Sequence, residues 1–134
     1  MKKQLGFLVL AAAISLTPAL AKKFPLDAAA SVPGAQGEVE TGKDKNGNTK
    51  VEIEVEHLAH PEKLTPPKTV YLVWFKQSGE APVVQGQLRM DKNLKGKFQT
   101  TTNAKSFDVI VTAESDLTLK APEGQEVLRA AVEQ

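Results

Sequence analysis

Apolar and polar residues alternate strictly over residues 51–56, where a glutamate follows every apolar position. The apolar positions are Val51, Ile53 and Val55. Successive side chains of a β-strand point to opposite faces of the sheet, so this pattern predicts a strand with one buried face and one hydrated face. Asn46-Gly47, just upstream, is favoured in hairpin turns because both central residues need a positive φ. We therefore expect an antiparallel hairpin here.

Two other segments, residues 69–76 and 107–114, are apolar on both faces. The first contains Trp74 and Tyr71, the only tryptophan and the only tyrosine of the chain. Apolar runs of this length, bounded by turn residues, predict central strands that are covered on both sides. Residues 82–90 follow as a return strand, in which Gly86 indicates a bulge or a close approach of another group.

The remaining segments predict short strands and turns. Residues 97–102 are polar and favour a β-strand, which suggests an edge strand, whereas the prolines of residues 60–68 exclude both a helix and a central strand. Residues 125–134 fit either a last strand or a helix. Turn signals recur every 8–12 residues or so, which predicts an all-β fold: an immunoglobulin-like antiparallel β-sandwich of about seven strands, preceded by a helical signal peptide.

The N-terminus has the pattern of a secretory signal. Two lysines precede an uncharged apolar core, Pro18 follows it, and Ala19-Leu20-Ala21 offers small residues at the positions that a signal peptidase recognises. A membrane anchor is the alternative, but a spanning helix needs about 20 apolar residues. The predicted organisation is a signal peptide over residues 1–21, a flexible linker over 22–36 and a β-sandwich domain over 37–134.

The composition narrows the possible environments and partners. The chain has no cysteine, so disulfides, thiol chemistry and thiolate metal sites are excluded. Its 17 basic and 16 acidic residues nearly balance, and this gives no electrostatic basis for nucleic-acid binding. We expect a bacterial protein that is periplasmic or secreted after cleavage at Ala21, with no membrane span in the mature chain.

Residues 69–130 resemble the extracellular domain of anti-sigma-K factors. The resemblance is carried by the order of short motifs: Tyr71-Leu72-Val73-Trp74, Gly86-Gln87-Leu88, Met90-Asp91, Val109 to Glu114, and Pro122 to Leu128. It implies a β-sandwich module. The cytoplasmic sigma-binding domain and the spanning helix of that family have no counterpart here, so the resemblance extends to the fold and not to sigma-factor inhibition.

His57 and His60 are the only histidines and the candidate metal ligands. Two imidazoles, with Glu56 or Glu62 as an oxygen ligand, are suited to zinc or copper. Residues three apart on a strand face opposite sides, so the two rings would converge only if the chain bends after Leu58. The alternative is a hydrated corner between a strand and a loop.

The other candidates for chemistry have simpler structural explanations. The glutamates at 52, 54 and 56 suit a calcium ion or a cationic partner, but the pattern favours the wet face of a strand opposed by lysines of the hairpin. Residues 44–48 resemble half of a calcium loop, but Val55 occupies the position of its bidentate glutamate. The serines lie in turns without a nucleophile motif or a plausible triad. We therefore predict no enzyme activity and no cofactor.

Three functional hypotheses remain. The first is a non-catalytic exported module with a binding or structural role in the bacterial envelope, whose partner is another envelope protein; the loop at 59–68 and the turn at 77–81 are its expected contact surface. The second is a periplasmic metal-binding carrier that uses His57 and His60. The third is an accessory sensory domain related to anti-sigma systems.

Overall fold

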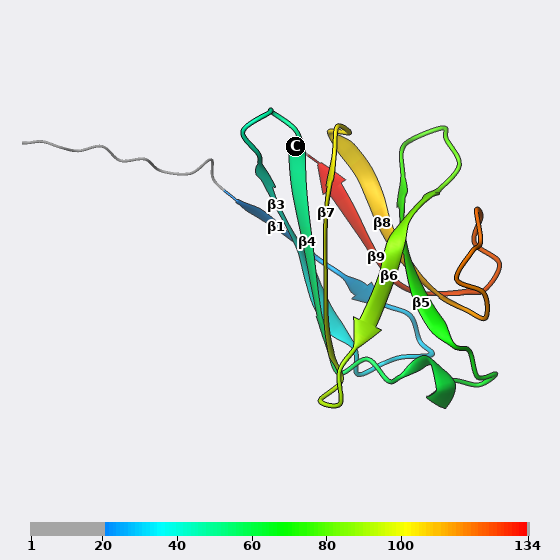
Figure 1. Ribbon diagram of the computed structural model, residues 1–134. Coiled ribbons are helices and arrows are strands. Elements are labelled where there is room, and N and C mark those ends of the chain that lie inside the picture. The colour runs from blue at the N-terminus through cyan, green and yellow to red at the C-terminus, as the bar shows by residue number, and fades with distance from the viewer. Residues whose placement is uncertain (1–20, 134) are drawn as a thin grey trace, which may run out of the picture.

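The computed structural model describes residues 21–133 and is built almost entirely of antiparallel strands (Figure 1). The predicted signal peptide, apart from Ala21, lies outside the described residues, as does Gln134. The elements are β1 (Lys22–Pro25), β2 (Asp27–Ala28), β3 (Gln36–Lys43), β4 (Thr49–Glu56), the 3₁₀ helix η1 (Pro61–Lys63), β5 (Val70–Lys76), β6 (Val83–Met90), β7 (Lys95–Thr102), β8 (Ser106–Glu114) and β9 (Gln125–Glu133).

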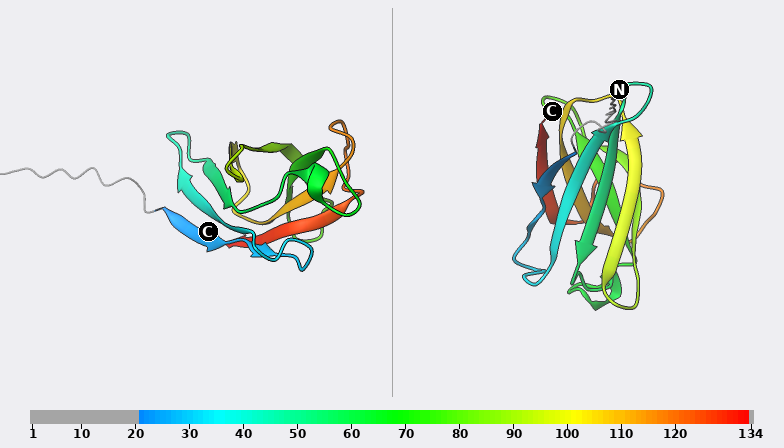
Figure 2. Two further views of the ribbon diagram at one scale, coloured as in Figure 1. Left: turned by 90° about the horizontal axis from the view of Figure 1, so that it is seen from below. Right: turned by 90° about the vertical axis from the view of Figure 1, so that its left-hand side faces the viewer.

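The strands form a closed barrel. Their order is β1-β3-β4-β7-β6-β5-β8-β9-β2, and the two strands at its ends, β1 and β2, are separated in sequence only by Leu26. Because β1 pairs with β3 and β2 pairs with β9, this N-terminal segment joins both ends of the order. Counting β1 and β2 as one strand gives an eight-stranded barrel, which encloses a common interior when viewed along its axis (Figure 2).

The predicted immunoglobulin-like sandwich is therefore wrong, although the all-β, antiparallel character is correct. The error comes from residues 22–36, predicted as a flexible linker. They contain β1 and β2, and Leu26 and Val32 are buried in the interior. The N–H of Leu26 also donates a 2.9 Å hydrogen bond to the carbonyl oxygen of Gly37. The segment changes partner at Leu26, so neither strand is long enough to show a periodic pattern.

The barrel interior is filled by the apolar side chains that alternate along the strands. Val51, Ile53 and Val55 of β4 are at most 1% exposed, as their alternation with glutamates predicted. Barrels of eight strands have an interior just wide enough to be filled by side chains. The largest fully buried contributors besides these are Tyr71, Leu58, Leu88, Leu128, Val39 and Val73.

The central strands β5 and β8 are buried on both faces, as predicted. Alternate residues of β5 point into the interior, whereas Leu72 and Trp74 point outward and pack with Ile110 of β8. The outer cluster is covered in part by Leu119, from the connection between β8 and β9, and not by a second sheet. Residues 125–133 form a strand, which settles the alternatives left open for the C-terminal segment.

Candidate functional site

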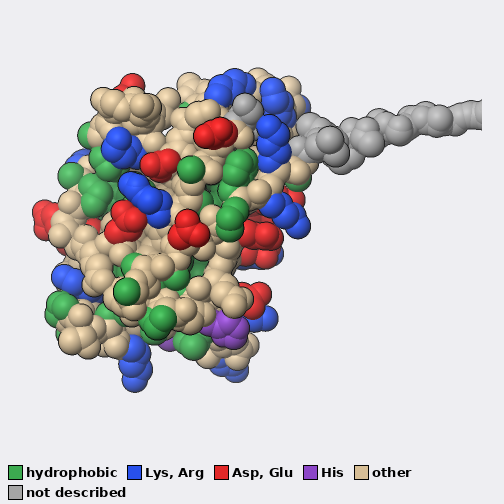
Figure 3. Space-filling view, turned by 180° about the vertical axis from the view of Figure 1, so that it is seen from behind, with side chains coloured by type: hydrophobic (Ala, Val, Ile, Leu, Met, Phe, Trp, Pro, Cys, Tyr) green, Lys and Arg blue, Asp and Glu red, His purple; other side chains and the backbone are tan. Residues whose placement is uncertain are grey.

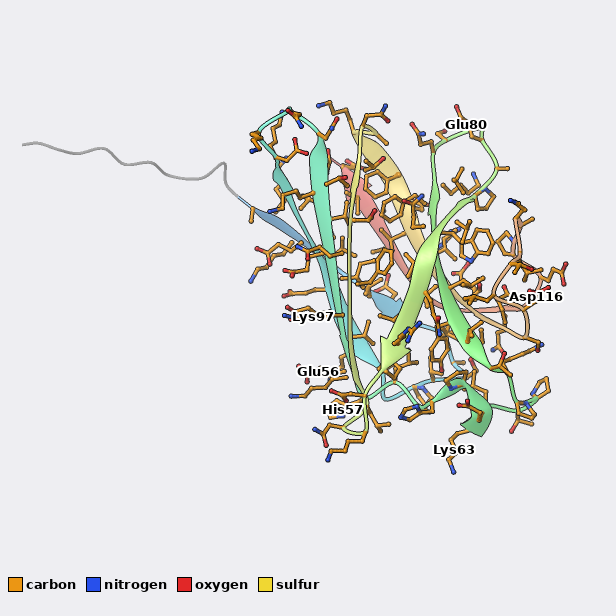
Figure 4. All side chains as sticks on the ribbon, viewed as in Figure 1. Glu56, His57, Lys63, Glu80, Lys97 and Asp116 are labelled. Atoms are coloured by element: carbon orange, nitrogen blue, oxygen red, sulfur yellow. The ribbon has the colours of Figure 1, made fainter. Side chains whose placement is uncertain are left out.

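The two histidines lie at one end of the barrel, in the corner between β4 and η1 (Figure 4). His57 has φ +61°, and its N–H donates a 2.8 Å hydrogen bond to the carbonyl oxygen of Leu94, which has φ +62°. His60 contacts the same turn through its side chain: its Nε2 lies 3.0 Å from the carbonyl oxygen of Asp91. His60 therefore links the loop after β4 to the turn between β6 and β7.

This arrangement offers little to a metal ion. The nearest carboxylate to His57 is that of Glu56, with Oε1 3.9 Å from Nε2, and one nitrogen of His60 is already engaged by Asp91. Within residues 21–133, no group of three or more histidine, cysteine, aspartate or glutamate residues is placed to hold a metal. The metal-carrier hypothesis thus finds no third ligand in the described part of the chain.

The glutamates of β4 point outward onto a charged, hydrated face (Figure 4). The register places Glu54 opposite Glu38 and Glu52 opposite Glu40, so the expected lysines of the hairpin are not their partners. Lysines of the neighbouring strands compensate instead: Lys97 lies 3.5 Å from Glu54, and Lys23 lies 3.9 Å from Glu38. Acidic and basic side chains are also intermingled on the opposite side of the molecule (Figure 3).

The two loops expected to form a contact surface lie far apart. Lys63, in the loop at 59–68, and Glu80, in the turn at 77–81, are at opposite ends of the barrel (Figure 4). They therefore do not form one surface.

The barrel wall is incompletely paired between β6 and β7. The two strands pair only at Arg89 with Lys97 and at Met90 with Gly96, although β6 pairs with β5 and β7 pairs with β4 over most of their lengths. Beyond these pairs the strands diverge (Figure 1). We call the two facing strand segments, residues 83–88 and 98–102, the open seam. The predicted edge character of 97–102 is thus correct for the part of β7 that lines the seam.

Two features at Gly86 lie where β6 and β7 no longer pair. The register with β5 passes from Val73–Gly86 to Trp74–Val84, so Gln85 is the extra residue of a β-bulge, which bends a strand and increases its twist. The ring of Phe98 also packs directly on Gly86: a Cβ atom built there would lie 2.7 Å from Cε1 of the ring. Both possibilities predicted for Gly86, a bulge and a close approach, are confirmed.

The backbone of β7 presents unpaired groups to the seam. In an antiparallel ladder, alternate residues direct their N–H and C=O groups to opposite neighbours. The N–H of His57 donates to the carbonyl oxygen of Leu94, so the even-numbered residues of β7 direct their backbone groups towards β4. The N–H of Asp91 donates to the carbonyl oxygen of Lys95, so the odd-numbered residues, which include Gln99 and Thr101, direct theirs towards β6 and into the seam. Buried or half-buried backbone groups need hydrogen-bond partners, from water or from another chain.

The side chains along the seam carry no charge. Its sequences are VVQGQL on β6 and FQTTT on β7, in a protein of which 25% of the residues are charged. Natural proteins commonly place charges, lysine above all, on unpaired strand edges to prevent association. The absence of charge from both edges makes the seam suitable for pairing with another strand.

Cationic side chains lie at the closed end of the seam. Arg89 and Lys97 are directly opposite each other, although like charges at such positions repel. Lys97 pairs with Glu54, whereas exposed Arg89 has no ion pair within residues 21–133. Both line a surface hollow of about 500 Å³, together with Lys95, Asp91 and Glu56. The carboxylate of Asp91 is occupied there by the N–H groups of its own turn.

The seam is not recognisable as a site from the sequence pattern. Its only signals were Gly86 and the polar 97–102 segment, and neither shows which strands lie side by side. Within residues 21–133 no helix has the length and apolar character needed to cross a membrane. No protein-family model matches the chain and no curated protein is significantly similar to it, so the resemblance to anti-sigma-K factors stays a prediction.

Proposed function

We propose that this protein is a non-catalytic binding module of the bacterial envelope that holds an extended segment of another envelope protein. The observation that carries the proposal is the open seam, with two uncharged strand edges that face each other in an otherwise continuous wall. Extended peptides bind sheet edges through main-chain hydrogen bonds, and pockets for alternate side chains provide specificity.

The scaffold suits such a role. The interior is filled by side chains from every long strand, so the wall keeps its shape without a ligand inside it. The proposed location rests on the predicted signal sequence. The first strand begins at Lys22, the residue that cleavage after Ala21 would make the N-terminus.

Site-specific photo-crosslinking in intact cells of the source organism tests this function. A photoreactive residue at Gln99, in the seam, is compared with one at Asp27, which is exposed on β2, a strand that pairs with neither β6 nor β7. We expect a discrete adduct with another envelope protein from position 99 and none from position 27. The absence of an adduct from both positions, and from further positions at the two ends of the barrel, would contradict a binding role.

A further inference from the structure

We infer that the segment held in the open seam is a C-terminal one: it is uncharged where it runs between β6 and β7, and its terminal carboxylate binds Arg89. This inference rests on the proposed function and specifies the chemistry of the partner. It follows from the backbone geometry, the side chains of the seam and the charges at its closed end.

The backbone geometry calls for a single strand. Gln99 and Thr101 of β7 direct N–H and C=O groups into the seam from one side, and Gln87, two residues before Arg89, does so from the other by the same alternation. A strand placed between them is hydrogen-bonded on both sides once the ring of Phe98, which packs across the seam on Gly86, moves aside. It therefore gains more main-chain bonds than a strand added to an ordinary sheet edge.

The side chains define the composition of the segment. Phe98 and Thr100 point inward, and Phe98 packs against the buried core, whereas Gln99 and Thr101 point outward and are exposed. A bound strand meets the same two environments, because its side chains alternate in register with those of its neighbours. Its inward residues are therefore apolar or small, and its outward residues are polar and uncharged.

The charges at the closed end of the seam determine the direction in which the bound segment runs. Below Arg89 and Lys97 the ladder continues through Met90 and Gly96 into the turn, so a strand lying in the seam ends or leaves it there. The hollow that these two cations line is also lined by Glu54, Glu56 and Asp91. Glu54 pairs with Lys97, Glu56 lies beside His57 and Asp91 accepts bonds from its own turn, so the preference for a carboxylate over a terminal ammonium group rests on Arg89. Arg89, which lacks an ion pair in the described residues, is the available partner. The bound segment then runs parallel to β6 and antiparallel to β7.

The test uses purified mature protein and two libraries of short random peptides, one with free C-terminal carboxylates and one with C-terminal amides. We expect enrichment from the first library only, of uncharged peptides with alternating apolar and polar residues. The best peptide is then resynthesised in both forms. Amidation of the peptide and Arg89→Gln in the protein should each weaken binding about tenfold to a hundredfold. Lys22→Gln, at an exposed lysine of β1, which is separated from β7 by two strands, is the matched charge control.

Proline substitutions test the backbone pairing. Gln99→Pro removes an N–H that faces the seam and should abolish peptide binding while the melting temperature changes little. Thr100→Pro removes an N–H directed at Val51 of β4 and should lower the melting temperature markedly. The contrast between neighbouring positions separates loss of the site from loss of the fold.

Several results would overturn the inference. Peptide binding that survives Gln99→Pro would place the site elsewhere. Equal enrichment from the amide library would show that binding does not require a terminal carboxylate. Peptides selected for an internal aspartate or glutamate would show that a side-chain carboxylate binds Arg89 instead. Self-association of the free protein that Gln99→Pro abolishes would make a second copy the occupant. Adducts in cells from positions outside the seam would, in contrast, preserve the proposed function while refuting the seam as its site.

Discussion

The indole Nε1 of Trp74 donates a 2.8 Å hydrogen bond to Oγ1 of Thr112 on the outer side of the barrel wall. Trp74 is fully buried there and Thr112 is 2% exposed, because the connection between β8 and β9 lies over them and contributes Leu119. A buried tryptophan usually pairs its N–H, and here the neighbouring strand supplies the acceptor. The chain thus maintains a second apolar cluster outside the interior.

Trp74→Ala should reduce the free energy of unfolding by about 3–5 kcal/mol, because it removes a buried aromatic side chain and leaves a cavity. Urea denaturation followed by circular dichroism measures the change. Leu117→Ala is the control: Leu117 belongs to the same covering connection but is 53% exposed, so its loss should cost at most about 0.5 kcal/mol. Similar values for the two variants would contradict a stabilising role of the outer cluster.

Tyr71 should make the protein lose stability at high pH. Burial, with a smaller contribution from the charge of Glu62, raises the pKa of Tyr71 to about 12. Its hydroxyl donates a 2.6 Å hydrogen bond to the carbonyl oxygen of Ala59. An unfolded tyrosine has a pKa of about 10, so the native state favours the neutral phenol by about 2–3 kcal/mol.

That stabilisation is fully present below pH of about 10 and is lost as the pH rises towards 12. Because Tyr71 is the only tyrosine, the ultraviolet absorbance of tyrosinate reports its titration directly. Tyr71→Phe should cost about 1 kcal/mol at neutral pH through the lost hydrogen bond, and should remove this alkaline phase. Titration of the native protein with a midpoint of about 10 would contradict the prediction.

Leu94→Gly should stabilise the protein by about 1 kcal/mol, because Leu94 is held at φ +62°, a conformation that costs an L-residue about 1–2 kcal/mol and glycine almost nothing. Thermal unfolding measures the gain. Lys92→Gly in the same turn is the control, since Lys92 is not among the positive-φ residues. There, greater freedom of the unfolded chain should lower stability by about 0.4–1 kcal/mol.

Gly86→Ala should destabilise the protein by about 1–3 kcal/mol, because the added methyl group collides with the ring of Phe98. Replacing Phe98 by leucine in the same protein should recover part of that loss, and a double-mutant cycle measures the coupling. Gly42→Ala is the control, since an added Cβ atom there has no neighbour within 4 Å. Additive effects of the changes at 86 and 98 would contradict a direct contact between the two residues.

The mature protein should begin at Lys22. N-terminal sequencing of the protein isolated from the culture medium and from the periplasm tests both the cleavage and the location. An intact leader in membrane fractions would instead indicate an anchored protein.

The local sequence pattern was enough to predict the long central strands, but not the short strands β1 and β2. Alternation along β4, apolar character on both faces of β5 and β8, and turn residues between them are local properties, because the side chains of a strand point to alternate faces whatever its neighbours are. The same local pattern around Gly86 predicted the bulge and the close approach that the structure contains.

How the strands close, and where they fail to pair, depends on tertiary contacts. Barrel and sandwich share the same alternating strands, and they differ here through Leu26, at which a short N-terminal segment passes from β3 to β9. The open seam likewise contains the contact of Phe98 with Gly86, two residues on different strands. Such pairings are made between residues that are distant in the chain, so the pattern within any one segment carries no record of them.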